Sequence, residues 1–311
     1  MKMMKKISLA YISILFFNLP VHLCAQEIKV KFLYKIDLSP IAANTATTFS
    51  NLSVSDENRI YLVDSGLNRI ILTDSLGRKQ KEVGGFGWEL EQFDQPNAIW
   101  AENALDVFVA DYNNSRIQRF DRNLNFVTAL IGDEVSNADM VFAFPVAVAW
   151  SRFGDLFIIE SELNRVLQFD EIGEAVNAFG DFDEGAGQLI SPVDLCVSDD
   201  EKIFVADQGR HAIMKFDYYG NFLQELTLHS LSQLDAIIWQ KKKLFLLDGQ
   251  KNQVTIASEN GDIIVDFTPV PVTEDKKSSQ LTDLCMQKNH LYILDDTRKM
   301  IHVYIVSTWR K

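Results

Sequence analysis

The chain has 311 residues, of which 47% are hydrophobic, 11% aromatic and 23% charged, and its formal net charge is −13. A chain this apolar, with 21 phenylalanines, is not disordered. A chain this acidic does not bind nucleic acid by covering phosphates with Lys and Arg, and its three cysteines are too few for a disulfide scaffold.

The first residues have the pattern of a secretory signal peptide. Lys2, Lys5 and Lys6 precede an apolar run over 7–19, and Ala25 is a small residue at a cleavage site. We therefore expect residues 1–25 to be removed and the mature chain to be exported to the periplasm, the cell surface or the medium. Cleavage would remove three lysines and no acid, which makes the mature chain still more acidic.

A cysteine in this segment leaves a second interpretation open. Lipidation of Cys24 would make the protein a lipoprotein, but His22 and Leu23 occupy the places where lipoprotein signals carry small residues. The apolar run is shorter than the roughly 20 residues that a membrane helix needs, and no later segment is long enough. We expect no transmembrane segment.

One unit recurs six times along the rest of the chain. Its clearest copies are "VFVADYNNSRIQRFD" (107–121), "LFIIESELNRVLQFD" (156–170) and "IFVADQGRHAIMKFD" (203–217), with weaker copies before and after them. The copies are 41 to 49 residues apart, a period that fits one four-stranded blade of a β-propeller. They align on six acids, the anchor acids: Asp64, Asp111, Glu160, Asp207, Asp248 and Asp295.

Each unit has the pattern of four short strands, a to d. Strand a is apolar and often begins with proline, as at Pro96, Pro145 and Pro192, where no ladder donor is lost. Strand b ends at the anchor acid, strand c follows it, and a turn such as "DSLG" (74–77) leads to strand d. The glycine permits the positive φ of a tight turn.

The sixth unit lacks a fourth strand, and an alternating segment at 27–38 can supply it. We infer that this segment closes the ring, because closure pairs the edges that would otherwise be exposed. The sequence therefore predicts an all-β fold with a single domain over 26–311. The expected blades are 49–93, 94–142, 143–189, 190–231, 232–278 and 279–306, the last completed by 27–38.

The repeat resembles the NHL-repeat family. Strand b ends in a hydrophobic residue followed by Val-Ala-Asp, and strand c contains Arg-Ile and then Phe-Asp, as in "VFVADYNNSRIQRFD" (107–121). This order is similar to that family's pattern, and so are the linkers at 83–96 and 178–192. The resemblance implies a six-bladed β-propeller that serves mainly as a binding platform. Some relatives bind RNA or protein partners and a few related propellers are enzymes, so the fold alone does not decide the function.

The repeated polar residues have a structural and a functional interpretation. A feature present in every blade serves the repeat, and the anchor acids can accept hydrogen bonds from loop amides. Arg69, Arg116 and Arg165 lie five residues after their anchors and could pair with a neighbouring blade's acid. Because they cover half of the ring, they could also form a binding sector, which Arg210 and Lys251 would extend.

Strand a lines the central channel of a propeller. Its third aligned position holds Asn51, Asp194, Asp235 and Asp283, with alanine in the other two blades. Converging oxygens would suit Ca²⁺, and this arrangement resembles calcium-dependent lactonases of the gluconolactonase type, although a clear channel-facing Glu is missing. The alternative is that these side chains cap exposed amides or bind water. No other cofactor is expected.

Aromatic side chains in the connections between blades are a further candidate site. They either fill gaps between blades or form an apolar surface for a partner; they are Phe86, Trp88, Phe93, Phe142, Phe144 and Phe182. We expect an exported, monomeric, non-catalytic module that binds a protein, peptide or glycan and no nucleic acid. A calcium-dependent hydrolase is the alternative. Cys196 and Cys285 lie on strands a two blades apart, too far for a disulfide.

Overall fold

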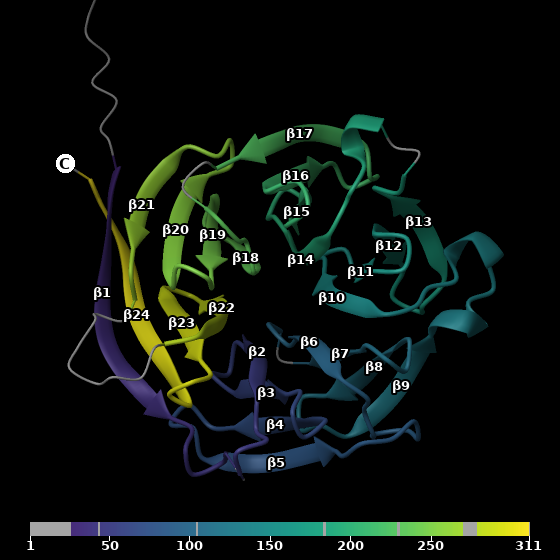
Figure 1. Ribbon diagram of the computed structural model, residues 1–311, viewed down its shortest axis with the longest axis horizontal. Coiled ribbons are helices and arrows are strands. Elements are labelled where there is room, and N and C mark those ends of the chain that lie inside the picture. Colours follow the sequence, from purple (N-terminus) through teal and green to yellow (C-terminus); the bar gives the residue numbers. More distant parts are fainter. Residues whose placement is uncertain are drawn as a thin grey trace, which may run out of the picture.

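Each repeat of the sequence folds into one antiparallel sheet of four strands in the computed structural model, which describes residues 26–42, 44–103, 105–182, 185–228, 231–269 and 279–310. The predicted signal peptide lies outside these residues. The six sheets surround a central axis like the blades of a propeller (Figure 1), as the sequence predicts.

The first three blades follow the chain without interruption. The first comprises β2 (Phe49–Val54), β3 (Ile60–Asp64), β4 (Arg69–Thr73) and β5 (Lys79–Gly84). The second comprises β6 (Pro96–Trp100), β7 (Asp106–Asp111), β8 (Arg116–Asp121) and β9 (Phe126–Ile131). The third comprises β10 (Pro145–Trp150), β11 (Leu156–Glu160), β12 (Arg165–Phe169) and β13 (Ala175–Phe179).

The next two blades repeat this order, and the sixth takes its outer strand from the beginning of the chain. Blade four comprises β14 (Pro192–Val197), β15 (Ile203–Asp207), β16 (Ala212–Phe216) and β17 (Phe222–Thr227). Blade five comprises β18 (Ala236–Gln240), β19 (Lys243–Asp248), β20 (Gln253–Ser258) and β21 (Ile263–Phe267). Blade six comprises β22 (Leu281–Gln287), β23 (His290–Asp295), β24 (Met300–Arg310) and β1 (Gln26–Asp37).

The core lies between the blades. The second and third strands are apolar on both sides, and in β3, β11, β12, β15 and β16 every residue is buried. Both faces of a blade therefore pack against its neighbours, and six hydrophobic clusters fill the six junctions. The outer strands alternate or are exposed, as β5 is, because one of their faces meets solvent.

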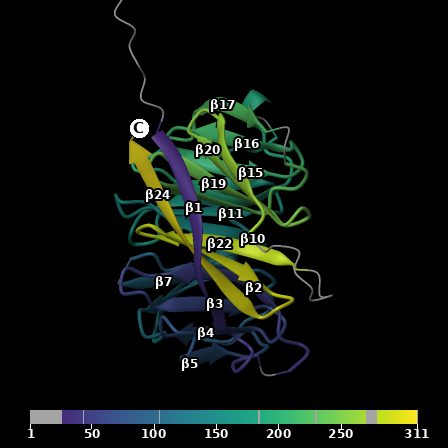
Figure 2. The ribbon, with the colours of Figure 1, turned by 90° about the vertical axis from the view of Figure 1, so that its left-hand side faces the viewer.

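The ring is closed by the pairing of β1 with β24. The two strands pair from Gln26 opposite Arg310 to Asp37 opposite Met300, with one irregularity between Phe32 and Tyr34. They lie side by side on the outside of blade six in both ribbon views (Figures 1 and 2). The predicted closure is confirmed. β24 continues past the expected end at 306 because β1 offers it a partner along its whole length.

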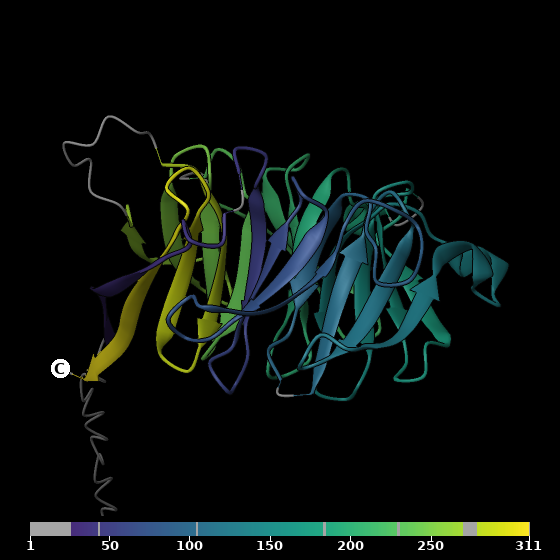
Figure 3. The ribbon, with the colours of Figure 1, turned by 90° about the horizontal axis from the view of Figure 1, so that it is seen from below.

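The ring has two faces, which Figure 3 shows above and below the strands. We call the side formed by the b–c loops and the connections between blades the loop face. The opposite side, formed by the a–b and c–d turns, is the turn face. The loop-face connections include short 3₁₀ helices at Gly132–Glu134, Ala138–Met140 and Gly185–Gly187. In the part of the chain that the structure describes, no helix has the length and apolar character needed to cross a membrane.

The c–d turns follow the predicted chemistry. In blade one the Asp74 carboxylate accepts hydrogen bonds from the amides of Leu76 and Arg78, at 2.9 and 3.0 Å. Gly77 has φ +79°, and a Cβ there would lie 2.5 Å from the Ile36 side chain. In blade two Leu124 takes the same left-handed conformation, with φ 58°.

Removal of β1 tests the closure. A chain without residues 26–37 would leave the edge of β24 unpaired and the hydrophobic partners of Ile28 and Ile36 uncovered. Burial of two isoleucines contributes at least about 3 kcal/mol. We expect the free energy of unfolding to fall by that amount or more in urea titrations, and size-exclusion chromatography to show self-association. The control is a chain that begins at Gln26, and equal midpoints for the two chains would contradict closure by β1.

Candidate functional site

The anchor acids are buried in all six blades and hold the loop face together. Asp64 accepts a hydrogen bond from the amide of Thr48 at 2.9 Å, and Asp111 accepts one from Asp94 at 2.9 Å. These donors belong to the segments that lead into strand a, so each of these two acids ties the end of strand b to the beginning of its own blade. Asp207, Asp248 and Asp295 do the same, whereas Glu160 accepts its backbone hydrogen bonds from Glu162 and Leu163 in the b–c loop. This agrees with the predicted structural role.

The arginines that follow the first three anchors pair with the acid of their own blade. The distances from Nε to the carboxylate oxygen are 2.9 Å for Arg69, 2.8 Å for Arg116 and 2.8 Å for Arg165. The expectation that they pair with a neighbouring blade's acid is wrong. The reason is the register, because the first residue of strand c lies directly opposite the last residue of strand b.

The remaining guanidinium donors hold the connections between blades. Arg116 donates to the carbonyl oxygens of Trp88, Glu89 and Gln92 at 2.8, 2.9 and 2.9 Å. Arg165 does the same for Asp139 and Val141. Arg116 and Arg165 are buried, so they do not present free positive charge on the loop face.

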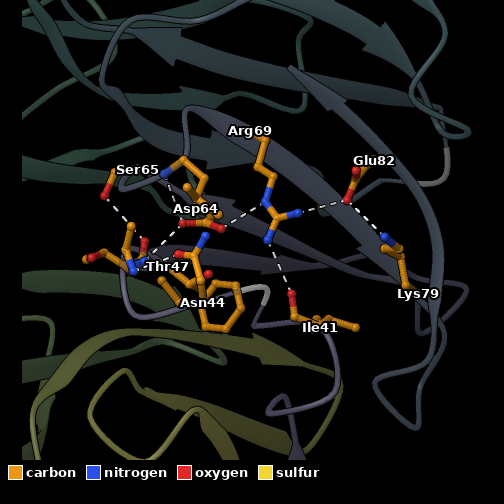
Figure 4. A network of polar contacts seen from close by, with 12 residues as sticks. Ile41, Asn44, Thr47, Asp64, Ser65, Arg69, Lys79 and Glu82 are labelled. Carbon is orange, nitrogen blue, oxygen red and sulfur yellow. Dashed lines mark hydrogen bonds and ion pairs between the residues drawn. The ribbon is translucent and has the colours of Figure 1, made fainter. Parts of the chain in front are cut away.

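Blade one shows the same arrangement in a more exposed form (Figure 4). Arg69 donates to the carbonyl of Ile41 at 3.2 Å and also meets Glu82 at 3.0 Å. Lys79 lies on the other side of Glu82, at 3.0 Å. The segment between β1 and β2, which contains Ile41, is therefore held by Arg69, and the ion pairs of Arg69 with Glu82 and of Glu82 with Lys79 extend to the surface.

In blade four the guanidinium comes from Arg210, three residues after the anchor. Its Nε donates to the carbonyl of Gln188 in the connection from blade three, and its Nη1 lies 3.2 Å from Glu225. Its side chain is 20% exposed. The arginines of the predicted binding sector are thus paired with acids of their own blades and with carbonyl groups of the connections.

Replacement of Arg116 by Met tests this structural role. The substitution removes the partner of the buried Asp111 carboxylate and three bonds to the connection, and breaking a buried pair of this kind costs about 3–5 kcal/mol. We expect that loss in the free energy of unfolding. The control is Arg122→Met, whose side chain is 47% exposed and should cost less than about 1 kcal/mol. Equal effects in urea titration would contradict the assignment.

Three of the four predicted channel residues join neighbouring blades. Asn51 accepts a hydrogen bond from the amide of Ile99 in blade two at 2.9 Å. Asp194 accepts one from Ile237 in blade five at 2.8 Å, and Asp283 accepts one from Leu52 in blade one at 2.7 Å. The alternative that these side chains cap exposed amides of inner strands is therefore confirmed.

Asp235 does not lie with them. In the other five blades the pairing of strand a with strand b has a register shift after the first residue of strand a, as between Phe49 and Asn51 in blade one. Blade five lacks this shift, so Ala236 takes the position there that Asn51 has in blade one. Asp235 is displaced by one residue toward the loop face, where it accepts hydrogen bonds from Gly249, Gln208 and Gln233. The prediction that Asp235 lines the channel is therefore wrong, and the reason is the register of the strand.

The channel carboxyls have strongly shifted acidity. A cavity of about 80 Å³ is lined by Asn51, Asp194 and Asp283 among other residues. Burial raises the pKa of Asp194 to about 7, and burial together with the charge of Asp194 raises that of Asp283 well above its usual range. Both pKa values rise although each carboxylate accepts two backbone hydrogen bonds, so desolvation is the larger effect.

A calcium ion at this place would have to compete with backbone N–H groups for every carboxylate oxygen of Asp194 and Asp283. In the described part of the chain, no three or more His, Cys, Asp or Glu side chains form a group that could hold a metal ion. The donor set is therefore a poor fit for the predicted calcium site.

The pH dependence of stability tests the shifted acid. A carboxyl with a folded pKa near 7 and an ordinary value in the unfolded chain binds its proton more tightly when folded, so stability falls as pH rises from about 4 to 7. In Asp194→Asn we expect this slope to decrease by up to about 1.4 kcal/mol per pH unit. Denaturant titrations between pH 4 and 8 measure it, with Glu134→Gln as control. An unchanged slope would contradict the shift.

The aromatic residues of the connections divide into two groups. Phe93 and Phe142 are buried and fill gaps between blades, whereas Phe86 and Trp88 are 69% and 74% exposed. Phe182 and Phe144 belong to the exposed group, at 71% and 38%. Leu90 lies in the same connection as Phe86 and Trp88 and is 54% exposed, but it was not among the predicted residues. Its position two residues after Trp88 is the feature of the sequence from which its exposure could have been predicted.

The connection that carries Phe86, Trp88 and Leu90 is fixed although these side chains are exposed. Its backbone is held by Arg116, and the side chain of Asn114 donates to the carbonyl of Gly87 at 2.9 Å. Its beginning at Gly84 and Gly85 has φ +129° and +113°, a conformation that favours glycine. The loop therefore presents three large apolar groups from a rigid backbone, and we call it the aromatic loop (84–95).

The surroundings of the aromatic loop are acidic. The b–c loops of blades one to three and the three connections that follow these blades contain no Lys or Arg apart from the arginines at the starts of strands c. Exposed acids are spread over this part of the loop face; they are Glu89, Glu91, Asp133, Glu134, Asp139 and Glu162. Among the described residues, the other basic side chains of the loop face lie in the b–c loops of blades four to six.

Comparison with known proteins agrees with the fold. A family model described as a 6-bladed beta-propeller matches residues 137–293. "Protein brain tumor" of Drosophila melanogaster is 30% identical over 146 residues, or 46% of this chain and 13% of that protein. "B-box type zinc finger protein ncl-1" of Caenorhabditis elegans is 26% identical over 147 residues, or 47% of this chain and 17% of that protein. The match spans less than a fifth of either relative.

Two solved structures are similar over nearly the whole chain. Virginiamycin B lyase from Staphylococcus aureus, in a catalytically inactive form with quinupristin, has a TM-score of 0.63 at 14% identity, covering 90% of this chain and 99% of the lyase. A putative gluconolactonase has a TM-score of 0.62 at 14% identity, covering 91% and 92%. Identities this low show a common fold and nothing more.

Proposed function

The chain belongs to the DUF5128 family of 6-bladed beta-propellers, and from this premise we propose that it is an exported, non-catalytic binding module of NHL-like repeats. It acts as a monomer, and its partner is a basic peptide segment of another protein. The aromatic loop is the centre of the binding surface. The single observation that carries the proposal is the exposure of Phe86, Trp88 and Leu90 on a backbone held by hydrogen bonds from the buried Arg116.

Pre-organisation supports recognition at this loop. Large apolar side chains cost free energy when they face water, and a cluster of them on a monomer marks an interaction site. Because Arg116 already fixes the carbonyls of Trp88, Glu89 and Gln92, binding does not have to order the loop. Rigid aromatic groups with few rotatable bonds are typical anchors of binding surfaces.

Charge supports a basic partner. The exposed acids around the aromatic loop create a negative potential that attracts Lys and Arg and repels acidic chains. The same potential is unfavourable for nucleic acid. A peptide with large apolar side chains between basic residues complements both the apolar centre and the acidic surroundings.

The hydrolase alternative has less support. Its metal ligands would be Asn51, Asp194 and Asp283, whose oxygens accept backbone hydrogen bonds, and Asp235, which lies elsewhere. The similarity to the putative gluconolactonase is one of fold.

Selection from a random peptide display library tests the proposal. We expect enriched peptides to combine Lys or Arg with aromatic or aliphatic residues, and their affinity to fall at least about tenfold in Trp88→Ala, because anchor residues cost more than about 1.4 kcal/mol when truncated. The matched control is Tyr219→Ala, since Tyr219 is 76% exposed on a c–d turn of the other face.

The outcomes separate the alternatives. Peptides that bind the Trp88 and Tyr219 variants equally would contradict the aromatic loop as the site, and enrichment of acidic peptides would contradict the charge argument. Glycan binding without peptide binding would overturn the choice of partner. Calcium-dependent hydrolysis of lactones by the wild-type chain, lost in Asp283→Asn, would overturn the non-catalytic function.

A further inference from the structure

The turn face carries a second cavity that the proposed function does not use. It has a volume of about 450 Å³ and lies where the inner strands end, around the mouth of the central channel. Its lining includes two tryptophans, two carboxylates and two glutamines; we call it the vestibule, and these residues are Trp100, Trp150, Asp56, Glu102, Gln240 and Gln287. This volume lies in the range of small-molecule sites, roughly 300–1,000 Å³.

The aromatic wall of the vestibule is held in place. The ring centroids of Trp100 and Trp150 are 6.4 Å apart, and Phe108 stacks on Trp150 at 4.8 Å. The Arg119 guanidinium lies over the rings of Phe108 and Trp150, and its Nη2 is 2.8 Å from Asp106. Both tryptophans also line the inner cavity of the channel, so they lie at the passage between the two spaces.

The vestibule has an excess of negative charge. Its one arginine, Arg152, is paired with the buried Glu201, with 2.8 Å between Nε and Oε1. Asp56 accepts a hydrogen bond from Gln287 at 3.1 Å, and among the described contacts neither Asp56 nor Glu102 has a cationic partner. The Asp194 carboxyl lies deeper along the same axis and adds to the negative potential of the channel when the pH is above its raised pKa of about 7.

The acidity of Glu102 reflects this crowding. Its side chain is exposed to the solvent of the vestibule and also lines the inner cavity of the channel. The loss of bulk water and the charge of Asp56 together raise the pKa of Glu102 to about 7. A positive charge bound beside the two carboxylates would relieve their repulsion.

We propose that the vestibule binds a small organic cation with an apolar surface, an alkylated ammonium. The indoles of Trp100 and Trp150 supply an aromatic lining that attracts such a cation, and Asp56 and Glu102 supply opposite charge. A neutral sugar would use the indoles and the amides of Gln240 and Gln287 but would leave the two carboxylates unpaired. The site lies on the other face from the aromatic loop, so it stands independently of the proposed peptide binding.

Calorimetric titration with choline and with 3,3-dimethyl-1-butanol tests the proposal. The two probes have the same shape, and the second replaces the charged nitrogen by carbon. At pH 8, where Glu102 is ionised, we expect choline to bind roughly tenfold more tightly or better, the size of effect that cation–π and charge contributions give. Equal binding of the two probes would overturn the proposal. So would the absence of choline binding at a probe concentration of about 50 mM, since a weaker dissociation constant would not indicate a specific site.

Variants locate the cation. Glu102→Gln keeps the shape of the side chain and removes its charge, and we expect it to weaken choline binding several-fold while leaving the neutral probe unchanged. Glu134→Gln removes one exposed charge from the loop face and is the matched control. Trp100→Phe should also weaken choline binding, because the indole attracts cations more strongly than the benzene ring.

The pattern of effects decides the outcome. Equal losses in the Glu102 and Glu134 variants would mean that only net charge matters and would overturn the site. A thermal melt of each variant accompanies the titration, so that a loss of folding is distinguished from a loss of binding. Binding of neutral monosaccharides with no preference for choline would likewise overturn it.

Discussion

A carboxylate buried at the end of a strand needs hydrogen-bond donors, and this requirement organises the whole loop face. Each anchor acid is fully buried and has donors in the b–c loop that follows it, and all except Glu160 also have a donor in the segment that enters strand a. An unpaired charge at such a place would cost several kcal/mol, so the loops cannot move away without a large penalty. The arginines of the first three blades extend this constraint into the connections. The aromatic loop is rigid for that reason.

The architecture could be predicted from the sequence because the pattern of one blade occurs six times along the chain. Six copies of one pattern, Gly-containing turns and an alternating segment at the start predict the ring and its closure, and the sheet order agrees. The structural role of the anchors followed from the same repetition. The pairing of Arg116 with Asp111 was missed because partner choice depends on register, and five residues of separation place the two opposite each other in one hairpin.

Positions that depend on a single residue of register were harder. Asp235 aligns with Asp194 by counting from the neighbouring motifs, but the absence of one irregularity in blade five moves it out of the channel. The aromatic residues could not be divided into buried and exposed either, since Phe93 and Trp88 lie five residues apart in the same connection and differ only in which way they point. The vestibule was not predicted, because its acids and tryptophans are spread over blades one to three and no motif joins them.

The pairing of β1 with β24 also determines where the chain enters and leaves. Asp37 and Met300 meet at the loop face, beside the b–c loop of blade six, so Gln26 and Arg310 meet at the opposite face (Figure 3). Whatever precedes residue 26 is therefore joined to the rim of the turn face. An attachment through the N-terminal side would therefore place the turn face toward the attachment point. The loop face, with the aromatic loop, would then point away from it.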